Sequence, residues 1–325
     1  MKINGSTIFT GIIGYPVEHT LSPAMQNAAF NKVGLNWKYL PFNVPPKEVK
    51  EALLGLAACG CRGLNVTMPH KKDVFDLVDS VEESARLLGM VNTVEFVGSK
   101  LVGHNTDGLG FLKSLKVEGP FEPAGKACLI IGAGGVGQSI ALSLASAGAA
   151  RIKVLNRTPE KAENIVVRIN EQFSGCEGSI GDIENPAELV DYDLIVNATS
   201  VGMEANPGLP VTLDALESWQ IVYDVIYRPS ETELLKEAKD KGANVINGTG
   251  MLLNQGAEAF SIWTGLHAPI EKMATALEEE LGRSENKEKS AASKQSVGKD
   301  NIGHKTGHSG PVNRGQGSRK REESP

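Results

Sequence analysis

A glycine-rich segment, Gly132-x-Gly134-x-x-Gly137, follows directly on the apolar run Cys128-Leu-Ile-Ile. An apolar run of this length is typical of a buried parallel strand, and the first glycine permits a tight turn after it. The second glycine lets the backbone approach a pyrophosphate, and the third lets the next helix pack closely with its N-terminal N–H groups toward the phosphates. A helical pattern over 138–147 and a second strand over 151–155 complete a βαβ unit. The segment therefore predicts a dinucleotide-binding site.

The residues after the second strand indicate which dinucleotide binds. A site for NAD usually offers Asp or Glu there to the ribose 2′-hydroxyl, whereas this chain has Asn156-Arg157-Thr158. Arg157 can pair with a 2′-phosphate and lie over the adenine, and Thr158 can donate a hydroxyl hydrogen bond. Thr158 is also suited to cap the helix that begins at Pro159. We therefore expect NADP.

If the dinucleotide delivers hydride to a carbonyl carbon, negative charge develops on the oxygen, and a neighbouring group must supply a proton or a positive charge. Lys71 follows the end of an expected strand by four residues, and Asp107 closes an expected hairpin. We predict that the two act as a catalytic pair, and the residues alone leave open which of them carries the proton. The alternative interpretations are a solvated lysine and an aspartate that caps the helix after it.

Polar side chains at other strand and helix ends could bind a small substrate. Asn65 and Thr67 share one strand face by period two, at the carboxyl end where open α/β sheets bind ligands. Thr20 and Ser22 bring hydroxyls to a helix N-terminus, which favours a carboxylate, and we expect Ser22 to cap that helix with Pro23 as its first residue. Asn92 opens the hairpin that Asp107 closes.

Alternating strands and helices must position these groups, which predicts an α/β fold with two domains and a cleft between them. Expected elements before residue 107 are strands over 7–13, 37–44 and 63–67, helices over 23–34, 46–58 and 81–88, and a hairpin of 90–97 with 100–103. Further strands are expected over 194–199, 221–227 and 244–247, with a helix over 232–241. We predict a substrate-binding domain (1–107) and a doubly wound Rossmann-type domain (108–250). The C-terminal segment (251–283) should form two helices, one that runs to residue 263 and one over 269–281, and should return to the first domain.

Composition is that of an ordinary globular protein, with 41% apolar and 22% charged residues among 325. The sequence contains neither an apolar run long enough for a membrane helix nor a recognisable signal sequence, so we expect no membrane partner. Its four cysteines, Cys59, Cys61, Cys128 and Cys176, form no CxxC pair. Reduced thiols, a cytoplasmic location and no metal site are therefore expected.

The tail over 284–325 is rich in Ser, Gly, Lys, Asn and Gln, and we predict that it is disordered and dispensable for catalysis. Its nine basic and five acidic residues give a net charge of +4. Charge this mild usually only solvates a segment, so no nucleic-acid partner is expected. Truncation after Arg283 should leave activity and folding intact.

Nine ordered motifs over about residues 1 to 282 resemble the shikimate dehydrogenase family. They are Gly14-Tyr-Pro-Val-Glu-His-Thr-Leu-Ser-Pro23, Asn65-Val-Thr-Met-Pro-His-Lys71, Asn92-Thr93, Asn105-Thr-Asp107, the glycine segment, Asn156-Arg-Thr158, Asn197-Ala-Thr-Ser200, Asp224-Val-Ile-Tyr227 and Gly250-Met-Leu-Leu-Asn-Gln255. This chain departs from the family in having Thr20-x-Ser22 for Ser-x-Ser and Gln26 for a common histidine. Threonine keeps the hydroxyl, so we expect carboxylate binding to survive.

The resemblance implies reversible reduction of 3-dehydroshikimate to shikimate by NADPH, in aromatic amino acid biosynthesis, by a monomer or homodimer. It implies that Thr20, Ser22 and Tyr227 hold the substrate carboxylate, that Asn65, Thr67, Asn92, Asp107 and Gln255 hold its hydroxyls, and that Lys71 is catalytic. It also implies cofactor contacts at Glu83, Gly132, Ala133, Gly134, Gly135, Val136, Asn156, Arg157, Thr158, Val225 and Gly248.

Two other functions remain open at this point. A quinate/shikimate dehydrogenase would accept an extra ring hydroxyl and often NAD, and the absence of a carboxylate after the second nucleotide-domain strand argues against it. A ligand sensor on the same fold could keep the carboxylate and nucleotide sites without catalysis, and the presence of both Lys71 and Asp107 disfavours it.

Overall fold

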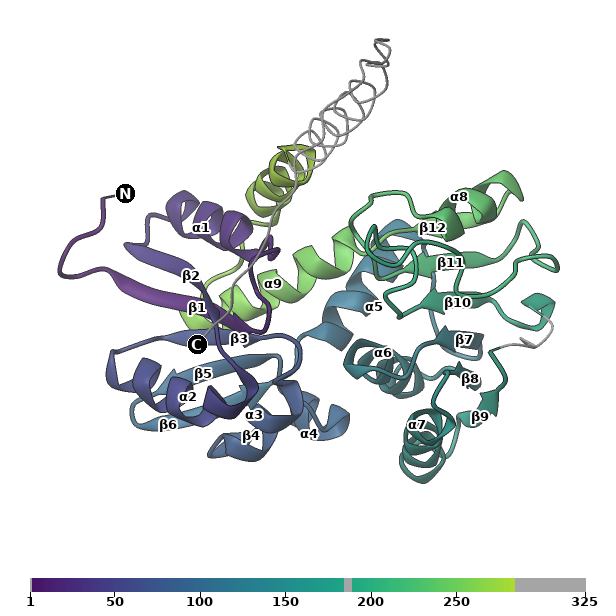
Figure 1. Ribbon diagram of the computed structural model, residues 1–325, viewed down its shortest axis with the longest axis horizontal. Helices are drawn as coiled ribbons and strands as arrows, with labels where there is room; N and C mark the ends of the chain where they lie inside the picture. Colours follow the sequence, from purple (N-terminus) through teal and green to yellow (C-terminus); the bar gives the residue numbers. More distant parts are fainter. Residues whose placement is uncertain (1, 184–188, 284–325) are drawn as a thin grey trace, which may run out of the picture. The chain divides into compact units, whose positions relative to one another are not determined.

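The computed structural model describes residues 2–183 and 189–283, and within these ranges the strands form two six-stranded sheets (Figure 1). The first sheet has the order β2-β1-β3-β5-β6-β4. Its strands are β1 Ile8–Gly14, β2 Trp37–Asn43, β3 Gly63–Val66, β4 Ser80–Val81, β5 Thr93–Val97 and β6 Lys100–His104. Strand β1 is parallel to β2 and β3, whereas β5 runs antiparallel to β3 and β6. The expected hairpin is confirmed, with Gly98 at a φ of +61° in its turn.

Helices cover both faces of this first sheet. One face packs on α2 Val49–Ala58, which follows a 3-10 turn at Pro46–Glu48, and on α3 Lys71–Leu77 and α4 Glu83–Leu88. The other packs on α1 Ser22–Lys32 and α9 Thr249–Thr264, through Met25, Phe30, Phe260 and Trp263. The Trp263 indole N–H donates to the carbonyl of Val94 at 3.1 Å. The C-terminal helix α9 is thereby fixed to the N-terminal sheet.

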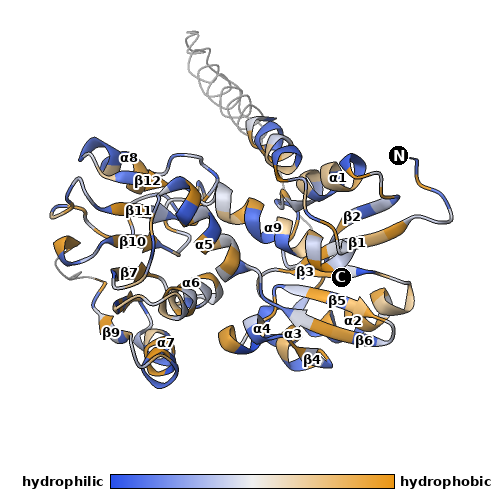
Figure 2. Ribbon diagram, turned by 180° about the vertical axis from the view of Figure 1, so that it is seen from behind, coloured by the Kyte–Doolittle hydropathy of each residue, from blue (hydrophilic) through white to orange (hydrophobic). Residues whose placement is uncertain are grey.

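The second sheet is parallel throughout and has the order β12-β11-β10-β7-β8-β9, the doubly wound Rossmann arrangement. Its strands are β7 Ala127–Ile131, β8 Arg151–Leu155, β9 Glu177–Gly181, β10 Leu194–Asn197, β11 Ile221–Asp224 and β12 Asn244–Ile246. Alternate residues of β7 belong to different cores, so both faces are covered. Figure 2 shows β10 and β11 as mainly hydrophobic and α8 as banded, as expected for strands buried on both faces and a helix buried on one.

The helices of the second sheet are α5 Asp107–Glu118, α6 Gly135–Ser146 and α7 Pro159–Gln172 on one face and α8 Glu233–Asp240 on the other. A short 3-10 turn, Leu189–Asp191, precedes β10. Helices α5 and α9 pack closely against each other between the two sheets (Figure 1). A Cβ on Gly110 of α5 would lie 2.7 Å from the backbone nitrogen of Gln255 on α9. This glycine therefore allows the two helices to approach almost backbone to backbone.

Several local predictions differ from the structure. Helix α3 was not expected, because its seven residues are too few to give a clear helical pattern. Strand β9 was missed because this edge strand is at most half-buried and so carries no apolar run. The helix expected after Gln255 begins earlier, at Thr249, since the side chain of Asn247 accepts the Thr249 N–H at 3.0 Å. A further helical stretch covers residues 270–283.

Other expectations concern what the chain lacks. The four cysteines are free thiols, and all but Cys59 are buried. In the part of the chain that the structure describes, no group of three or more His, Cys, Asp or Glu side chains could hold a metal ion. No described helix is long and apolar enough to cross a membrane. The predicted tail, 284–325, lies outside the described residues.

Candidate active site

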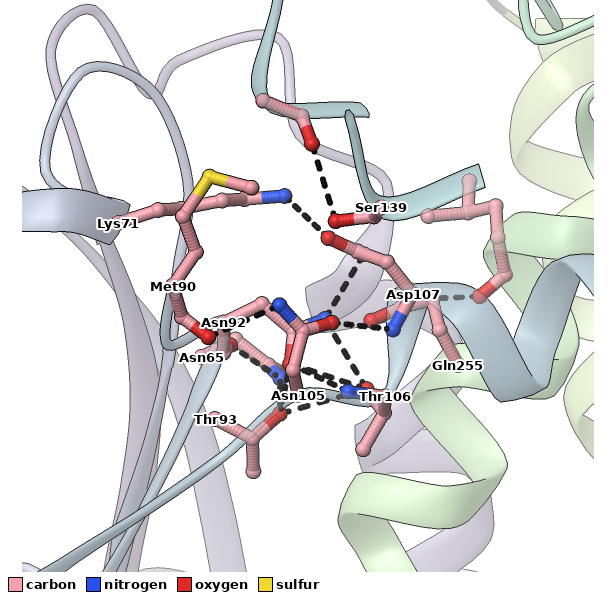
Figure 3. A network of polar contacts seen from close by, with 12 residues as sticks. Asn65, Lys71, Met90, Asn92, Thr93, Asn105, Thr106, Asp107, Ser139 and Gln255 are labelled. Atoms are coloured by element: carbon pink, nitrogen blue, oxygen red, sulfur yellow. Dashed lines mark hydrogen bonds and ion pairs between the residues drawn. The ribbon is translucent and has the colours of Figure 1, made fainter. Parts of the chain in front are cut away.

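Lys71 and Asp107 form a close ion pair at the first residues of α3 and α5. Lys71 Nζ lies 2.5 Å from Asp107 Oδ2, and the side chains are only 11% and 9% exposed. Figure 3 shows the lysine amine, from one side of the site, pointing at this carboxylate. Asp107 was open to a second interpretation, as a helix cap, and that interpretation is wrong. The cap position is Thr106, and the Asp107 carboxylate turns away from the helix N–H groups to bind Lys71 and Asn92.

A network of amides and hydroxyls holds the orientation of Asp107. Asn92 Nδ2 donates to Asp107 Oδ1 at 2.8 Å, and Asn92 Oδ1 accepts the Thr106 N–H, also at 2.8 Å. Asn105 Oδ1 accepts the Asp107 N–H at 3.0 Å, while its Nδ2 donates to the carbonyl of Met90 (Figure 3). These side chains are buried and bonded on both sides of the amide. The carboxylate is therefore preorganised before any ligand arrives.

Asn65, on β3, joins the same network through Thr93 on the adjacent strand β5. Its Nδ2 donates to Thr93 Oγ1 at 3.0 Å, and its Oδ1 accepts the hydroxyl proton of Tyr39 at 2.7 Å. Burial raises the pKa of Tyr39 well above its usual value, and the neighbouring Ser22 hydroxyl offsets part of that rise. Tyr39 thus links Asn65 to Ser22. Sequence reasoning missed Tyr39, because an aromatic residue in an apolar strand gives no sign of a polar role.

Thr20 and Ser22 lie together at the start of α1, as predicted, but their roles there differ from the expectation. The helix begins at Ser22 itself, with Leu21 at the cap position and no side-chain cap. Thr20 Oγ1 instead accepts the Ser22 N–H at 3.3 Å. Because the helix starts one residue early, the Ser22 side chain is that of a helical residue and is not placed to accept from the first turn.

The remaining predicted substrate residues are less tightly connected. Thr67 follows β3, with its N–H on the Ile13 carbonyl and its methyl group close to Gly14. Gln255 lies inside α9, where its Nε2 donates to the Leu252 carbonyl at 2.8 Å (Figure 3). Tyr227 is half-buried after β11, and burial raises its pKa. Among the described residues, no hydrogen bond joins Tyr227 to Thr20 or Ser22.

The glycine segment has the conformation that a dinucleotide requires. Gly132 adopts a φ of +106°, and a Cβ there would lie 2.9 Å from the Ala198 carbonyl oxygen. A Cβ on Gly137 would lie only 2.0 Å from the carbonyl oxygen of Gly132, so α6 approaches β7 as closely as glycine permits. Gly134 has open space where a side chain would be. The N-terminus of α6 is therefore accessible to a phosphate.

A pocket of about 500 Å³ opens beside this segment. It is lined by residues of the glycine loop, of the β8–α7 connection and of the chain after β10: Gly132, Gly134, Asn156, Arg157, Lys161, Ile183, Ala198, Thr199, Ser200, Val201, Leu209 and Pro210. Arg157 and Lys161 give it two cations, and Asn156 Oδ1 accepts the Ala133 N–H at 3.0 Å. These features fit a phosphorylated dinucleotide. Lys161 was missed, although it follows Arg157 by four residues at the start of a helix.

Thr158, Gly135 and Val136, which are also predicted cofactor residues, do not line this pocket. Thr158 occupies the cap position of α7, as expected, but its side chain makes no cap hydrogen bond. Its backbone is extended there, and its carbonyl instead accepts from Asn156 Nδ2 at 2.8 Å. Gly135 begins α6, and Val136 packs partly buried on the core beneath it.

Val225 and Gly248 lie in contact at the ends of β11 and β12. A Cβ on Gly248 would lie 2.0 Å from the Val225 carbonyl oxygen, so only glycine allows this approach. The neighbouring Asp224 is fully buried, which raises the pKa of its carboxyl, and it accepts from the Thr232 hydroxyl at 2.7 Å. Glu83 is exposed at the start of α4. Neither Val225, Gly248 nor Glu83 lines the pocket.

Three family models match the chain. The shikimate dehydrogenase substrate binding domain matches residues 12–94, the shikimate / quinate 5-dehydrogenase domain matches 117–203, and the shikimate 5′-dehydrogenase C-terminal domain matches 248–278. A protein of Methanopyrus kandleri called shikimate dehydrogenase (NADP(+)) is 45% identical over 287 residues, which cover 86% of this chain and 98% of that protein.

Solved structures are similar over the same region. A shikimate dehydrogenase in complex with NADP⁺ is 40% identical, with a TM-score of 0.81 over 86% of this chain and 98% of its own. The shikimate 5-dehydrogenase of Listeria monocytogenes, in complex with shikimate and NAD, is 37% identical, with a TM-score of 0.80 over 85% and 98%. A quinate dehydrogenase of Corynebacterium glutamicum in complex with NAD is 32% identical over 84% of this chain and 99% of its own, with a TM-score of 0.78.

Proposed function

This chain belongs to the shikimate dehydrogenase family, and on that premise we propose that it catalyses the reversible reduction of 3-dehydroshikimate to shikimate by NADPH. It is an NADP-dependent oxidoreductase of the shikimate pathway, which leads to the aromatic amino acids. The observation that carries its chemistry is the contact of 2.5 Å between Lys71 Nζ and the Asp107 carboxylate.

Lys71 is the catalytic residue of this proposal. NADPH, when bound, supplies the hydride that reduces the substrate carbonyl. The oxygen of that carbonyl gains negative charge as the carbon is reduced, and the Lys71 ammonium can donate a proton to it to complete the hydroxyl group. Asp107 orients the ammonium through Oδ2, while Asn92 holds its other oxygen. Asp107 remains in direct contact with Lys71 Nζ, so it keeps the ammonium in place while the proton is transferred.

The substrate would lie in the cleft between the two domains, beside Lys71 and Asp107. We assign its carboxylate to the hydroxyls of Thr20, Ser22 and Tyr227, and the first two are supported by their place at the N-terminus of α1. Its hydroxyls are assigned to Asn65, Thr67, Asn92, Asp107 and Gln255. The shared network of Asn65, Asn92 and Asp107 supports this assignment, because such fixed donors and acceptors select a polyhydroxylated ring.

The cofactor is assigned to the pocket beside the glycine segment. Its pyrophosphate would lie at Gly132, Ala133, Gly134, Gly135 and Val136, at the N-terminus of α6. Its 2′-phosphate would lie at Asn156, Arg157 and Thr158, with Lys161 as a second cation. Glu83, Val225 and Gly248 are assigned to its remaining contacts.

The proposal extends to the organisation of the chain. Residues 1–107 would bind the substrate, 108–250 the cofactor, and 251–283 would complete the substrate site from α9. We propose that the protein acts in the cytoplasm on small molecules, without a nucleic-acid or membrane partner, as a monomer or homodimer. Analytical ultracentrifugation of the full chain would distinguish the two states.

One spectrophotometric experiment tests the function. The purified protein is given shikimate or quinate with NADP⁺ or NAD⁺, and reduced cofactor is followed at 340 nm. We expect the highest kcat/KM with shikimate and NADP⁺. Comparable or faster turnover of quinate with NAD⁺ would instead support a quinate/shikimate dehydrogenase, and no turnover of any pair would reject the enzymatic assignment.

A further inference from the structure

Two side chains on helices that cover the nucleotide-binding sheet bind the C-terminus of α4, a helix that covers the N-terminal sheet. Gln138 Nε2, on α6, donates to the Leu88 carbonyl at 2.7 Å. Arg168, on α7, donates through Nη1 to the same carbonyl at 3.0 Å and through Nη2 to the carbonyl of Leu87. The last carbonyls of a helix have no partner within it, so these donors satisfy groups that α4 leaves free.

The local structure is built to admit this contact. Helix α4 ends at Gly89, with a φ of +66°, and a Cβ there would lie 3.3 Å from Arg168 Nη1. A larger residue would therefore crowd the guanidinium as well as strain the backbone. Arg168 is half-buried, and burial lowers the pKa of its guanidinium. A partly desolvated guanidinium depends on hydrogen bonds for its stabilisation. Arg168 makes these bonds with carbonyls of α4, which belongs to the N-terminal sheet and not to the nucleotide-binding sheet.

A short series of contacts leads from this point to the substrate site. The chain continues from Leu88 through Gly89 to Met90, whose sulfur lies 3.3 Å from where a Gly135 Cβ would be, at the start of the glycine-loop helix. The Met90 carbonyl accepts from Asn105, and Asn92 binds the Asp107 carboxylate. Only three residues, 89–91, therefore separate the carbonyl that Gln138 and Arg168 bind from the side-chain amide of Asn92 that orients Asp107.

We propose that Arg168, together with Gln138, is a positioning residue that couples occupation of the dinucleotide site to the orientation of Asn92 and Asp107 at the substrate site. This inference rests on the proposed function. The N-terminus of α6 faces the site assigned to the pyrophosphate, so a displacement of α6 on cofactor binding would reach Leu88 through Gln138. Arg168 would carry a displacement of α7 to Leu87 and Leu88 in the same way. Coupling of this kind is reciprocal, so each ligand should bind more tightly in the presence of the other.

Calorimetric titration measures the coupling directly. The affinity of NADPH is measured with and without saturating shikimate, and that of shikimate with and without NADPH, for the wild type, R168M, R168K and Q138L, because these two reduced ligands cannot react with each other. The matched control is R151M, because Arg151 also donates to a backbone carbonyl, that of Asp191 at 3.3 Å, but within the nucleotide-binding sheet. We expect a wild-type factor of about fivefold or more, the usual range for coupled sites.

In R168M the factor should fall below about twofold, while the affinity for NADPH alone stays nearly unchanged. R168K and Q138L should give intermediate factors, since each keeps part of the contact, and R151M should match the wild type. A loss of thermal stability in R168M with unchanged coupling would overturn the inference and leave Arg168 a structural residue. Should R168M fail to fold, R168K and Q138L decide by the same measure. Wild-type protein that binds both ligands without coupling also overturns the inference, whereas wild-type protein that binds neither rejects the proposed function itself.

Discussion

Replacing Lys71 and Asp107 singly and together should show that the ion pair acts as a unit. Hydride transfer without a proton donor is slow, so Lys71→Ala should lower kcat by about 10²-fold to 10⁴-fold, with a far smaller change in substrate KM. Asp107→Ala should lower kcat and also raise KM, because the carboxylate is assigned to a substrate hydroxyl as well. The double variant should be little worse than the poorer single variant, since the second loss removes a group that the first has already made ineffective.

The same variants should also differ in thermal stability, because the Lys71–Asp107 ion pair is buried. The side chains of the pair are 11% and 9% exposed, so Asp107→Ala leaves a poorly hydrated ammonium without its counter-ion. Breaking a buried pair in this way costs roughly 3 kcal/mol, or about 6–12 °C in Tm for a chain of this size. Removing Lys71 as well eliminates the stranded charge, so the double variant should be more stable than Asp107→Ala.

The neighbouring residue supplies a control. Lys72 lies next to Lys71 in α3 and pairs with Asp76 at 2.9 Å, but these side chains are 63% and 60% exposed. Lys72→Ala should therefore change stability by less than about 0.5 kcal/mol and leave kcat unaltered. Steady-state kinetics and thermal unfolding are measured for the two single variants of the pair, the double variant and Lys72→Ala, each against the wild type. Full activity in Lys71→Ala, or losses that multiply in the double variant, would refute the catalytic pair.

Three further predictions concern the cofactor, pH and packing. Arg157→Ala should weaken NADP⁺ binding by roughly 1.5–3 kcal/mol and NAD⁺ binding hardly at all, and equal losses in titrations with both would show that Arg157 only supports its loop. Burial lowers the pKa of His104, so the unfolded chain binds its proton first, and stability should be lost as pH falls below about 6.5 toward the folded pKa. Urea unfolding between pH 5 and 7.5 should show a smaller loss in His104→Gln, and parallel pH profiles would contradict this cause. Gly110→Ala should destabilise the protein by about 1–3 kcal/mol, because the added Cβ would meet the backbone of α9. Gly55→Ala, which has open space around it in α2, should stabilise the protein by up to about 1 kcal/mol. Urea unfolding midpoints that shift in the same direction for both variants would exclude this steric explanation.

Local patterns were sufficient wherever a residue's role follows from its immediate neighbours. The glycine segment, its strand and its helix were predictable because glycine alone fits the φ of +106° at Gly132 and the close approach at Gly137. The hairpin turn at Gly98 and the left-handed end of α1 at Gly34 follow from the same freedom of glycine. Arg157 in place of an acidic residue likewise indicates NADP from the sequence alone.

Long-range packing decided the rest. Neither the spacing of Lys71 and Asp107 nor their residue types could show that 36 residues of chain close into a contact of 2.5 Å, because that distance depends on how β3, the hairpin and α5 meet. Capping rules pointed to Ser22 and Asp107, and both proved to be helical residues, since tertiary partners outweighed local N–H groups worth only about 1 kcal/mol each. Tyr39 entered the site for the same reason. Its hydroxyl acquires a role only because the parallel pairing of β1 with both β2 and β3 brings it to Asn65, and strand order is a property of the folded sheet that no single strand encodes.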